Sequence, residues 1–185
     1  MVFQPNLQNP VPAYLLRNEI PAAIRNIYNS MASCLYPDVN AFTEEYRRWG
    51  VGSGPMYKIP DEAKFLNRVC DMLVMESGKE LWLAPGTPRY WLEPGKKIEL
   101  YKAATTFGNV SYELRNGSVP NTIEASVNLP LAVIPEKILL FVRAPFDMPI
   151  KSVKIDGKYW EKFDQEREAV ILPADIKTME VVISF

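Results

Sequence analysis

Residues 81–100 read LWLAPGTPRYWLEPGKKIEL, and the character of the chain changes at this stretch. It holds Trp82 and Trp91 together with three prolines and two glycines. Large aromatic side chains favour burial, whereas proline fits neither the interior of a long helix nor a central strand. The stretch is therefore predicted to join two structural regions, with a strand beginning at Glu80 and a turn at Pro94–Gly95.

Before Gly78 the apolar residues recur at helical spacing. Two helices are predicted, from Pro21 to Ser33 and from Asp61 to Met75, and each has a proline near its start. A short third helix is predicted between them, from Phe42 to Trp49, followed by a surface loop in the glycine-rich run GVGSGP. The first part of the chain is thus expected to be mainly helical.

After Gly78 the apolar residues alternate with polar ones, which is the period of a β-strand. KILLFVR is apolar on both faces and is predicted to be a central strand, and Asp156-Gly157 is typical of a two-residue hairpin turn. The other predicted strands are KKIELYKA (96–103), VSYELR (110–115), TIEASVNL (122–129), AVIL (169–172) and MEVVISF (179–185). Short strands separated by glycine and proline predict an antiparallel sandwich.

These patterns predict an α+β fold with two domains, a helical segment at 1–78 and an antiparallel β-sandwich at 79–185. Trp82 and Trp91 are expected to fill the seam between the two regions. The alternative is that one of them stacks on a sugar ring from a surface loop.

Composition excludes several kinds of partner. Lys and Arg number 21 against 22 Asp and Glu, so nothing in the charge balance favours nucleic acid. No apolar run approaches the roughly 20 residues that a membrane helix needs. The start of the chain, MVFQPNLQNPVP, has neither the basic residues nor the apolar segment of an export signal.

The chain has 185 residues and 0 histidines, which excludes Ser-His-Asp and Cys-His catalytic sites and the common zinc sites that contain histidine. No metal or cofactor is expected. Cys34 and Cys70 lie among helical apolar positions and are expected to be buried small hydrophobic residues. Any catalysis would depend on carboxylates.

Residues 18–185 resemble the C-terminal region of bacterial six-hairpin glycosidase-like proteins. The resemblance lies in the order of four parts, a helix ending in LVMESG, the bridge LWLAPGTPRYWLEPGKKI, the strands AATTFGNVSYEL and the run LLFVRAPFDMPIKSVKIDGKYW. It implies that the helical segment is the end of an (α/α)6 toroid and that the sandwich packs on it. Because a toroid needs twelve helices, the chain is expected to be the C-terminal end of such a protein.

The resemblance also implies carbohydrate as the partner of the parent enzyme and a periplasmic or secreted location for that enzyme. The helices would lack the rest of the toroid, which would leave their apolar faces partly exposed. Exposed apolar patches of this kind tend to associate, so a homodimer through the helical part is expected.

A glycosidase uses two carboxylates that flank one bond, about 5–5.5 Å apart for retention or 6.5–9.5 Å for inversion. The candidates are Glu44 and Glu45 in AFTEEYRRWG, with Tyr46, Arg47 and Trp49 as residues that would line a sugar cleft. Neighbours on a helix do not converge on one bond, so the chain alone is expected to be inactive. The alternative is a solvated helix start in which Glu44 pairs with a following arginine.

Two functions follow from these observations. The first is the non-catalytic C-terminal part of a glycoside hydrolase acting on polysaccharide, whose sandwich stabilises the barrel and borders its cleft. The second is an autonomous module that binds carbohydrate or protein through exposed aromatic residues, for which the candidates are Tyr90, Trp91, Tyr159 and Trp160. Buried tryptophans would favour the first function, and a flat exposed row of rings would favour the second.

Overall fold

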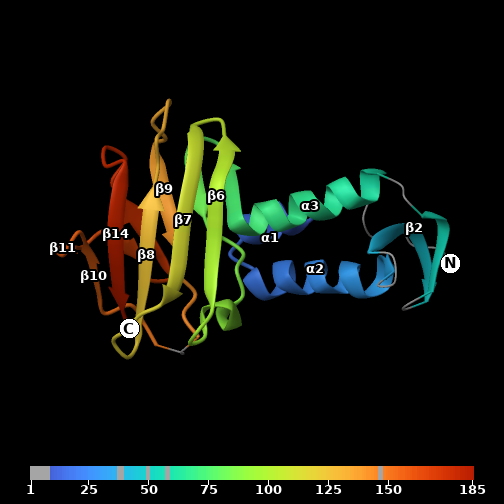
Figure 1. Ribbon diagram of the computed structural model, residues 1–185, viewed down its shortest axis with the longest axis horizontal. Coiled ribbons are helices and arrows are strands. Elements are labelled where there is room, and N and C mark those ends of the chain that lie inside the picture. Colours follow the sequence, from blue (N-terminus) through green and yellow to red (C-terminus); the bar gives the residue numbers. More distant parts are fainter. Residues whose placement is uncertain (1–8, 37–39, 49–50, 57–58, 146–147) are drawn as a thin grey trace. The chain divides into compact units, whose positions relative to one another are not determined.

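The computed structural model describes residues 9–36, 40–48, 51–56, 59–145 and 148–185. The chain forms two compact units, Met1–Met72 and Leu73–Phe185. The first holds the helices and the second holds two sheets of mostly antiparallel strands, so the predicted α+β class is confirmed (Figure 1). Among the described residues, no helix has the length and apolar character needed to cross a membrane.

The described residues of the first unit form three helices and a three-stranded sheet. Its elements are α1 (Val11–Leu16), α2 (Ile20–Cys34), β1 (Leu35–Tyr36), β2 (Ala41–Arg48), β3 (Val51–Met56) and α3 (Ile59–Leu73). The prediction of α2 is confirmed, with Pro21 in its first turn, where the missing N–H removes no helical hydrogen bond.

α3 begins at Ile59. Asp61 and Glu62 lie in its first turn, where acidic side chains interact favourably with the helix dipole.

The predicted third helix, Phe42 to Trp49, is wrong. Ala41–Arg48 forms β2, which pairs with β1 and, through two irregularities in register, with β3. The described contacts of Phe42 explain the preference for a strand. Its N–H donates to Glu62 Oε1 at 3.0 Å, and its ring lies 4.5 Å from that of Phe65, so α3 holds the strand in an extended path. The run GVGSGP, expected to be a loop, supplies most of β3.

The second unit is a sandwich of two sheets. The strands are β4 (Val74–Ser77), β5 (Glu80–Leu83), β6 (Lys97–Thr105), β7 (Gly108–Asn116), β8 (Thr122–Asn128), β9 (Lys137–Phe141), β10 (Ser152–Ile155), β11 (Lys158–Trp160), β12 (Phe163–Asp164), β13 (Ala169–Leu172) and β14 (Thr178–Ser184), with a 3-10 turn at Arg89–Leu92. The six-stranded sheet has the order β11-β10-β14-β8-β7-β6, and the five-stranded sheet has the order β12-β13-β9-β5-β4.

Two features of the five-stranded sheet differ from the prediction. The helix expected to end at Met75 ends at Leu73, because Val74 and Met75 pair with Leu83 and Trp82 in β4 and β5. The sheet is also not wholly antiparallel, since β5 and β9 run parallel. β9 is nevertheless central, as its apolar sequence predicts.

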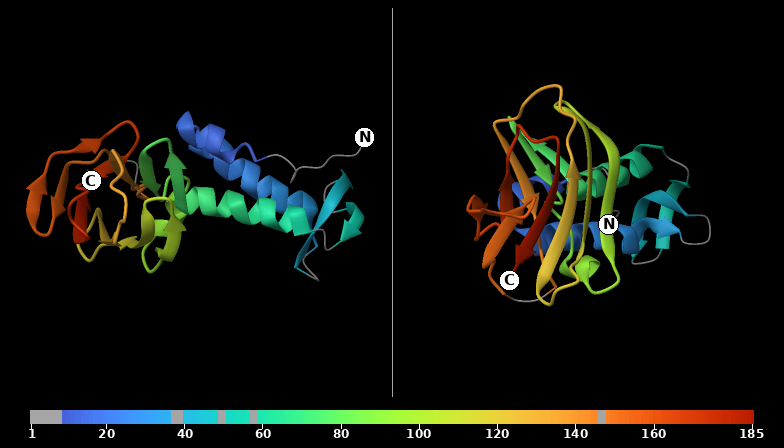
Figure 2. Two further views of the ribbon diagram at one scale, coloured as in Figure 1. Left: turned by 90° about the horizontal axis from the view of Figure 1, so that it is seen from above. Right: turned by 60° about the vertical axis from the view of Figure 1, so that its left-hand side comes forward.

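One hydrophobic core fills the space between the two sheets. Figure 2 shows the strands of the sandwich from two further directions. Alternate residues of each strand enter it, including Leu81 and Leu83 of β5 and Tyr112 and Leu114 of β7. The polar residues between them lie on the outer face, as the period of two requires. The residues between the core positions of each strand therefore form the outer face of the six-stranded sheet.

The hairpin of β10 and β11 has the predicted turn. Asp156 and Gly157 have φ values of 48° and 79°, the positive values that a two-residue turn needs.

The two cysteines differ in exposure. Cys34 is buried, as expected, whereas Cys70 is exposed on α3, so its predicted burial is wrong. The apolar spacing in the sequence did not show that Cys70 lies on the exposed side of α3.

Candidate functional site

The two carboxylates singled out in the sequence, Glu44 and Glu45, are consecutive residues of β2. Both side chains are half-buried, lie near Gly54 of β3 and have interaction partners. Tyr46 and Arg47 also belong to β2, but their side chains lie outside the described part of the chain, as does all of Trp49. The predicted sugar cleft around these residues thus remains a prediction.

The aromatic residues proposed for a binding module do not form one flat row. Tyr90 and Tyr159 are exposed, whereas Trp91 and Trp160 are half-buried and pack against the sandwich core. The rings of Tyr90 and Trp91 meet edge to face at 88°. Trp160 Nε1 donates to the carbonyl of Ile171 at 2.8 Å, which fixes the ring to β13.

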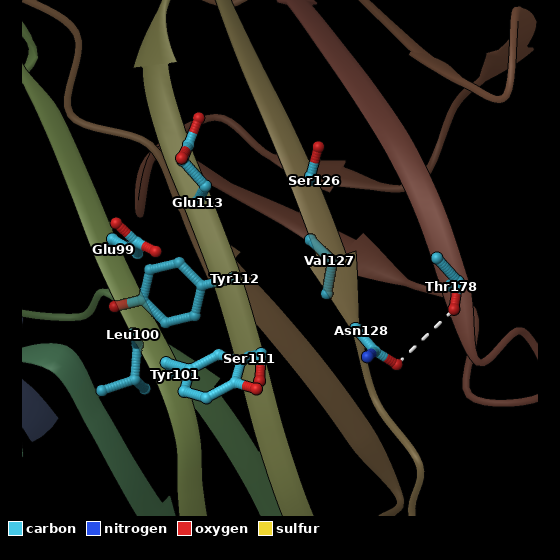
Figure 3. Close-up of a pocket in the computed structure, with 10 residues that line it drawn as sticks. All are labelled: Glu99, Leu100, Tyr101, Ser111, Tyr112, Glu113, Ser126, Val127, Asn128 and Thr178. Atoms are coloured by element: carbon cyan, nitrogen blue, oxygen red, sulfur yellow. Dashed lines mark hydrogen bonds between the residues drawn. The ribbon is translucent and has the colours of Figure 1, made fainter.

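A shallow pocket of about 200 Å³ lies on the outer face of the six-stranded sheet (Figure 3). Its lining residues come from four neighbouring strands, β6, β7, β8 and β14. They are Glu99, Leu100, Tyr101, Ser111, Tyr112, Glu113, Ser126, Val127, Asn128 and Thr178. Six of these carry hydroxyl, amide or carboxylate groups on the outward-facing positions of their strands.

The strand register arranges these polar groups in two rows. In the first row Glu99 lies opposite Glu113, which lies opposite Ser126. In the second row Asn128 lies opposite both Ser111 and Thr178. The rows are two residues apart, or about 7 Å along the strands.

A β-bulge in β6 places Tyr101 at the end of the second row. Leu100 pairs with Tyr112 and Ala103 with Val110, so Tyr101 and Lys102 together face the single residue Ser111. Lys102 has a φ of 49°, and its N–H donates to Ser111 Oγ at 2.9 Å. Bulges re-aim side chains, and here the Tyr101 side chain is 72% exposed at the margin of the pocket.

Lys97 bridges the two carboxylates of the first row. Its Nζ lies 2.7 Å from Glu99 Oε2 and 2.9 Å from Glu113 Oε2. The hydrogen bonds to Glu99 and Glu113 raise the pKa of Lys97, with a further contribution from their negative charges. The ammonium therefore lies between the carboxylates, where the bond to be cleaved would have to lie in a glycosidase.

The pocket offers both donors and acceptors to a ligand. The Ser111 hydroxyl accepts a hydrogen bond from the Lys102 N–H and can donate its own proton to a ligand. Asn128 Oδ1 accepts a hydrogen bond from Thr178 at 3.5 Å, and the amide N–H groups of Asn128 can donate to a ligand. Ser126 is more occupied, because its hydroxyl contacts both oxygens of Glu180, at 2.7 and 2.8 Å.

Sequence reasoning missed the pocket residues. The strands themselves were predicted, and their outward positions, which include Glu99, Ser111, Glu113 and Ser126, could have been read from the same alternation. The bulge that exposes Tyr101 has no comparable signal in the sequence. Among the described residues, no group of three or more Cys, Asp or Glu side chains is placed to hold a metal ion.

No protein-family model and no curated protein matches the chain. Among solved structures, the α-L-rhamnosidase from Dictyoglumus thermophilum is similar over 75% of this chain and 16% of its own, with 11% sequence identity and a TM-score of 0.42. A GH127 β-arabinofuranosidase is similar over 87% of this chain and 27% of its own, with 12% identity and a TM-score of 0.39. The chain thus spans less than a third of either glycosidase.

Proposed function

We propose that this chain is the non-catalytic C-terminal part of a glycoside hydrolase that acts on polysaccharide. In this role the sandwich stabilises the catalytic barrel and borders its cleft. The resemblance of residues 18–185 to the C-terminal region of six-hairpin glycosidase-like proteins supports the assignment, as does the order of helices followed by sandwich.

The observation that carries the non-catalytic part of the proposal is the position of Lys97. Glu99 and Glu113 lie opposite each other on the neighbouring strands β6 and β7. They are the two carboxylates that line the pocket of the sandwich, so they are its candidates for a glycosidase pair. The Lys97 ammonium binds Oε2 of both, so in this arrangement it lies where a substrate bond or a water would have to lie. Glu44 and Glu45 already have partners of their own.

The alternative, an autonomous module that binds through Tyr90, Trp91, Tyr159 and Trp160, has less support. Its tryptophans pack against the core, and a side chain held in this way presents little ring surface to a ligand. The buried position of Trp82, which is 3% exposed, agrees with a structural use of the tryptophans.

The test is a hydrolysis assay of the chain on a panel of aryl glycosides. We expect no turnover above that of a mock purification. Turnover that disappears in Glu44→Gln, Glu45→Gln, Glu99→Gln or Glu113→Gln, but persists in the surface control Glu136→Gln, would show that the chain is itself an enzyme.

A further inference from the structure

We propose that the pocket on the outer face of the six-stranded sheet binds a sugar ring of a neutral polysaccharide, with Tyr101 as its aromatic contact. This inference rests on the function proposed above for its choice of polysaccharide as the ligand. It adds a binding site to a part of the chain that otherwise has only a supporting role.

The polar lining of the pocket matches the hydroxyl groups of a polyol. A sugar ring presents hydroxyls, each a donor and an acceptor, around an apolar ring face. The second row offers donors from Ser111 and Asn128, and the first row offers acceptors from Glu99 and Glu113. Because the rows lie about 7 Å apart, hydroxyls on opposite sides of one ring can reach both.

The exposed ring of Tyr101 offers an aromatic surface to a sugar ring. A tyrosine supplies a flat apolar contact with little loss of conformational entropy on binding. The Lys102 ammonium lies 5.0 Å from the ring centroid and can occupy one side of the ring only. The bulge and the hydrogen bond from Lys102 to Ser111 fix the backbone from which the ring projects, so the contact surface is formed before a ligand arrives.

The charges that line the pocket select among sugars. The charged residues that line the pocket are Glu99 and Glu113, and Glu180 lies beside it on Ser126. Cations surround this lining: Lys97 binds both carboxylates, Lys102 lies over the Tyr101 ring, and Arg115 Nη1 lies 3.9 Å from Glu113 Oε1. The lining itself is therefore acidic, and a sugar acid or a sulfated sugar held directly against Glu99 and Glu113 would be repelled. A neutral sugar meets no such cost and can accept hydrogen bonds from the free donors.

The experiment measures binding to the full chain by isothermal titration calorimetry. The probes are the neutral oligosaccharides xylohexaose, cellohexaose, mannohexaose and arabinohexaose, with trigalacturonate as the acidic counterpart. The variants are Tyr101→Ala and Asn128→Ala. The matched control is Tyr159→Ala, since Tyr159 is 76% exposed and also has a lysine, Lys154, over its ring at 4.9 Å.

We expect at least one neutral hexasaccharide to bind with a Kd of about 1 mM or lower, and about tenfold weaker binding in Tyr101→Ala. Tyr159→Ala should bind as the original chain does, and trigalacturonate should bind more weakly than the neutral probes. Asn128→Ala should weaken binding as well, so the assignment does not depend on one variant. Thermal unfolding midpoints of all variants confirm that they are folded.

Two results would overturn the site. One is that no neutral hexasaccharide binds at concentrations of about 5 mM, several times the expected Kd. The other is that binding survives Tyr101→Ala or is lost in Tyr159→Ala, which would place the contact on the β10–β11 hairpin. A chain that binds no sugar and has no turnover loses this site but keeps the proposed function. A chain that binds and cleaves keeps the site and loses the proposed function.

Discussion

The Arg167 guanidinium lies over the ring of Trp82, with 4.4 Å between its Cζ and the ring centroid. Trp82 also contacts the ring of Phe141 at 5.5 Å and donates from Nε1 to Glu80 at 2.8 Å. These contacts lie on the face of β5 opposite to Leu81 and Leu83, which enter the sandwich core. Trp82 is 3% exposed, so the predicted burial of this tryptophan is confirmed.

Removing the Trp82 side chain should therefore destabilise the protein strongly. We expect Trp82→Ala to lower the free energy of unfolding by about 3–5 kcal/mol, the usual range for deleting a large buried aromatic residue. Chemical denaturation measures this difference. The control Tyr159→Ala, at an exposed ring, should change it by less than about 0.5 kcal/mol. A loss below about 1 kcal/mol in Trp82→Ala would place the ring at the surface.

Arg143 should behave in the opposite way, because it is a buried cation whose hydrogen bonds are incomplete: its Nη1 donates to the Ala84 carbonyl at 3.5 Å. It is 3% exposed, and its Nη2 has no hydrogen-bond partner among the described residues. Burial lowers the pKa of Arg143 to about 10; nearby Glu168 opposes this shift, whereas Arg89 and Arg167 add to it. Glu168 itself is bound by Arg89 at 2.7 Å.

Replacing buried charged groups by well-packed apolar side chains of similar volume is often neutral or stabilising, by about 1–4 kcal/mol for whole ion pairs. We therefore expect Arg143→Met to leave the thermal unfolding midpoint unchanged or to raise it. Arg115→Met, which removes an exposed arginine paired with Glu124, serves as the control and should change stability by less than about 1 kcal/mol. A loss above about 2 kcal/mol in Arg143→Met would mean that this arginine stabilises the fold.

The strands of the sandwich could be predicted from the sequence because their signals are local. The alternation in TIEASVNL and MEVVISF, the doubly apolar KILLF and the Asp156-Gly157 turn each depend on a few neighbouring residues. The two faces of the six-stranded sheet follow from the same alternation.

The missed features depend on contacts between distant residues. Val74 and Met75 continue a helical pattern, yet they pair with a strand that begins at Glu80. The local sequence around Phe42 does not predict a strand, and Phe42 contacts Glu62 and Phe65 of α3, which come later in the chain. The parallel pairing of β5 with β9 brings together residues far apart in the chain. The candidate pocket was missed for the same reason, since it needs four strands and a bulge in register.

Acid should weaken the sandwich partly through Glu124. Hydrogen bonds from the Ser118 N–H and from Arg115 lower the pKa of Glu124 below its ordinary value of 4.5. A lowered folded pKa means that the folded state binds fewer protons than the unfolded state. The stabilisation is therefore fully present above pH 4.5 and is lost as the pH falls through the folded pKa.

The free energy of unfolding should thus fall less steeply with decreasing pH in Glu124→Gln than in the original chain. Urea denaturation at a series of values from about pH 5 to pH 2 measures the slope. Arg115→Gln removes one of the two sources of the shift and should give an intermediate slope. Equal slopes in all three proteins would show that Glu124 has the same pKa in both states.

The helices of the first unit should mediate self-association. Tyr28 on α2 and Leu66 on α3 are exposed apolar residues, while Ile27 of α2 and Met72 of α3 are buried. We expect a dimer in sedimentation velocity at tens of micromolar, and a shift toward monomer in Tyr28→Glu combined with Leu66→Glu. Tyr159→Glu, on the sandwich, should leave the dimer intact. A clean monomer of the original chain would contradict the prediction.

The central claim is that the chain contacts polysaccharide without cleaving it. The most direct measurement incubates the chain with the neutral hexasaccharide that it binds best and follows the products by mass spectrometry. We expect the hexasaccharide to stay intact at concentrations where it is mostly bound. Shorter products that form with the original chain and disappear in Glu44→Gln, Glu45→Gln, Glu99→Gln or Glu113→Gln would contradict it.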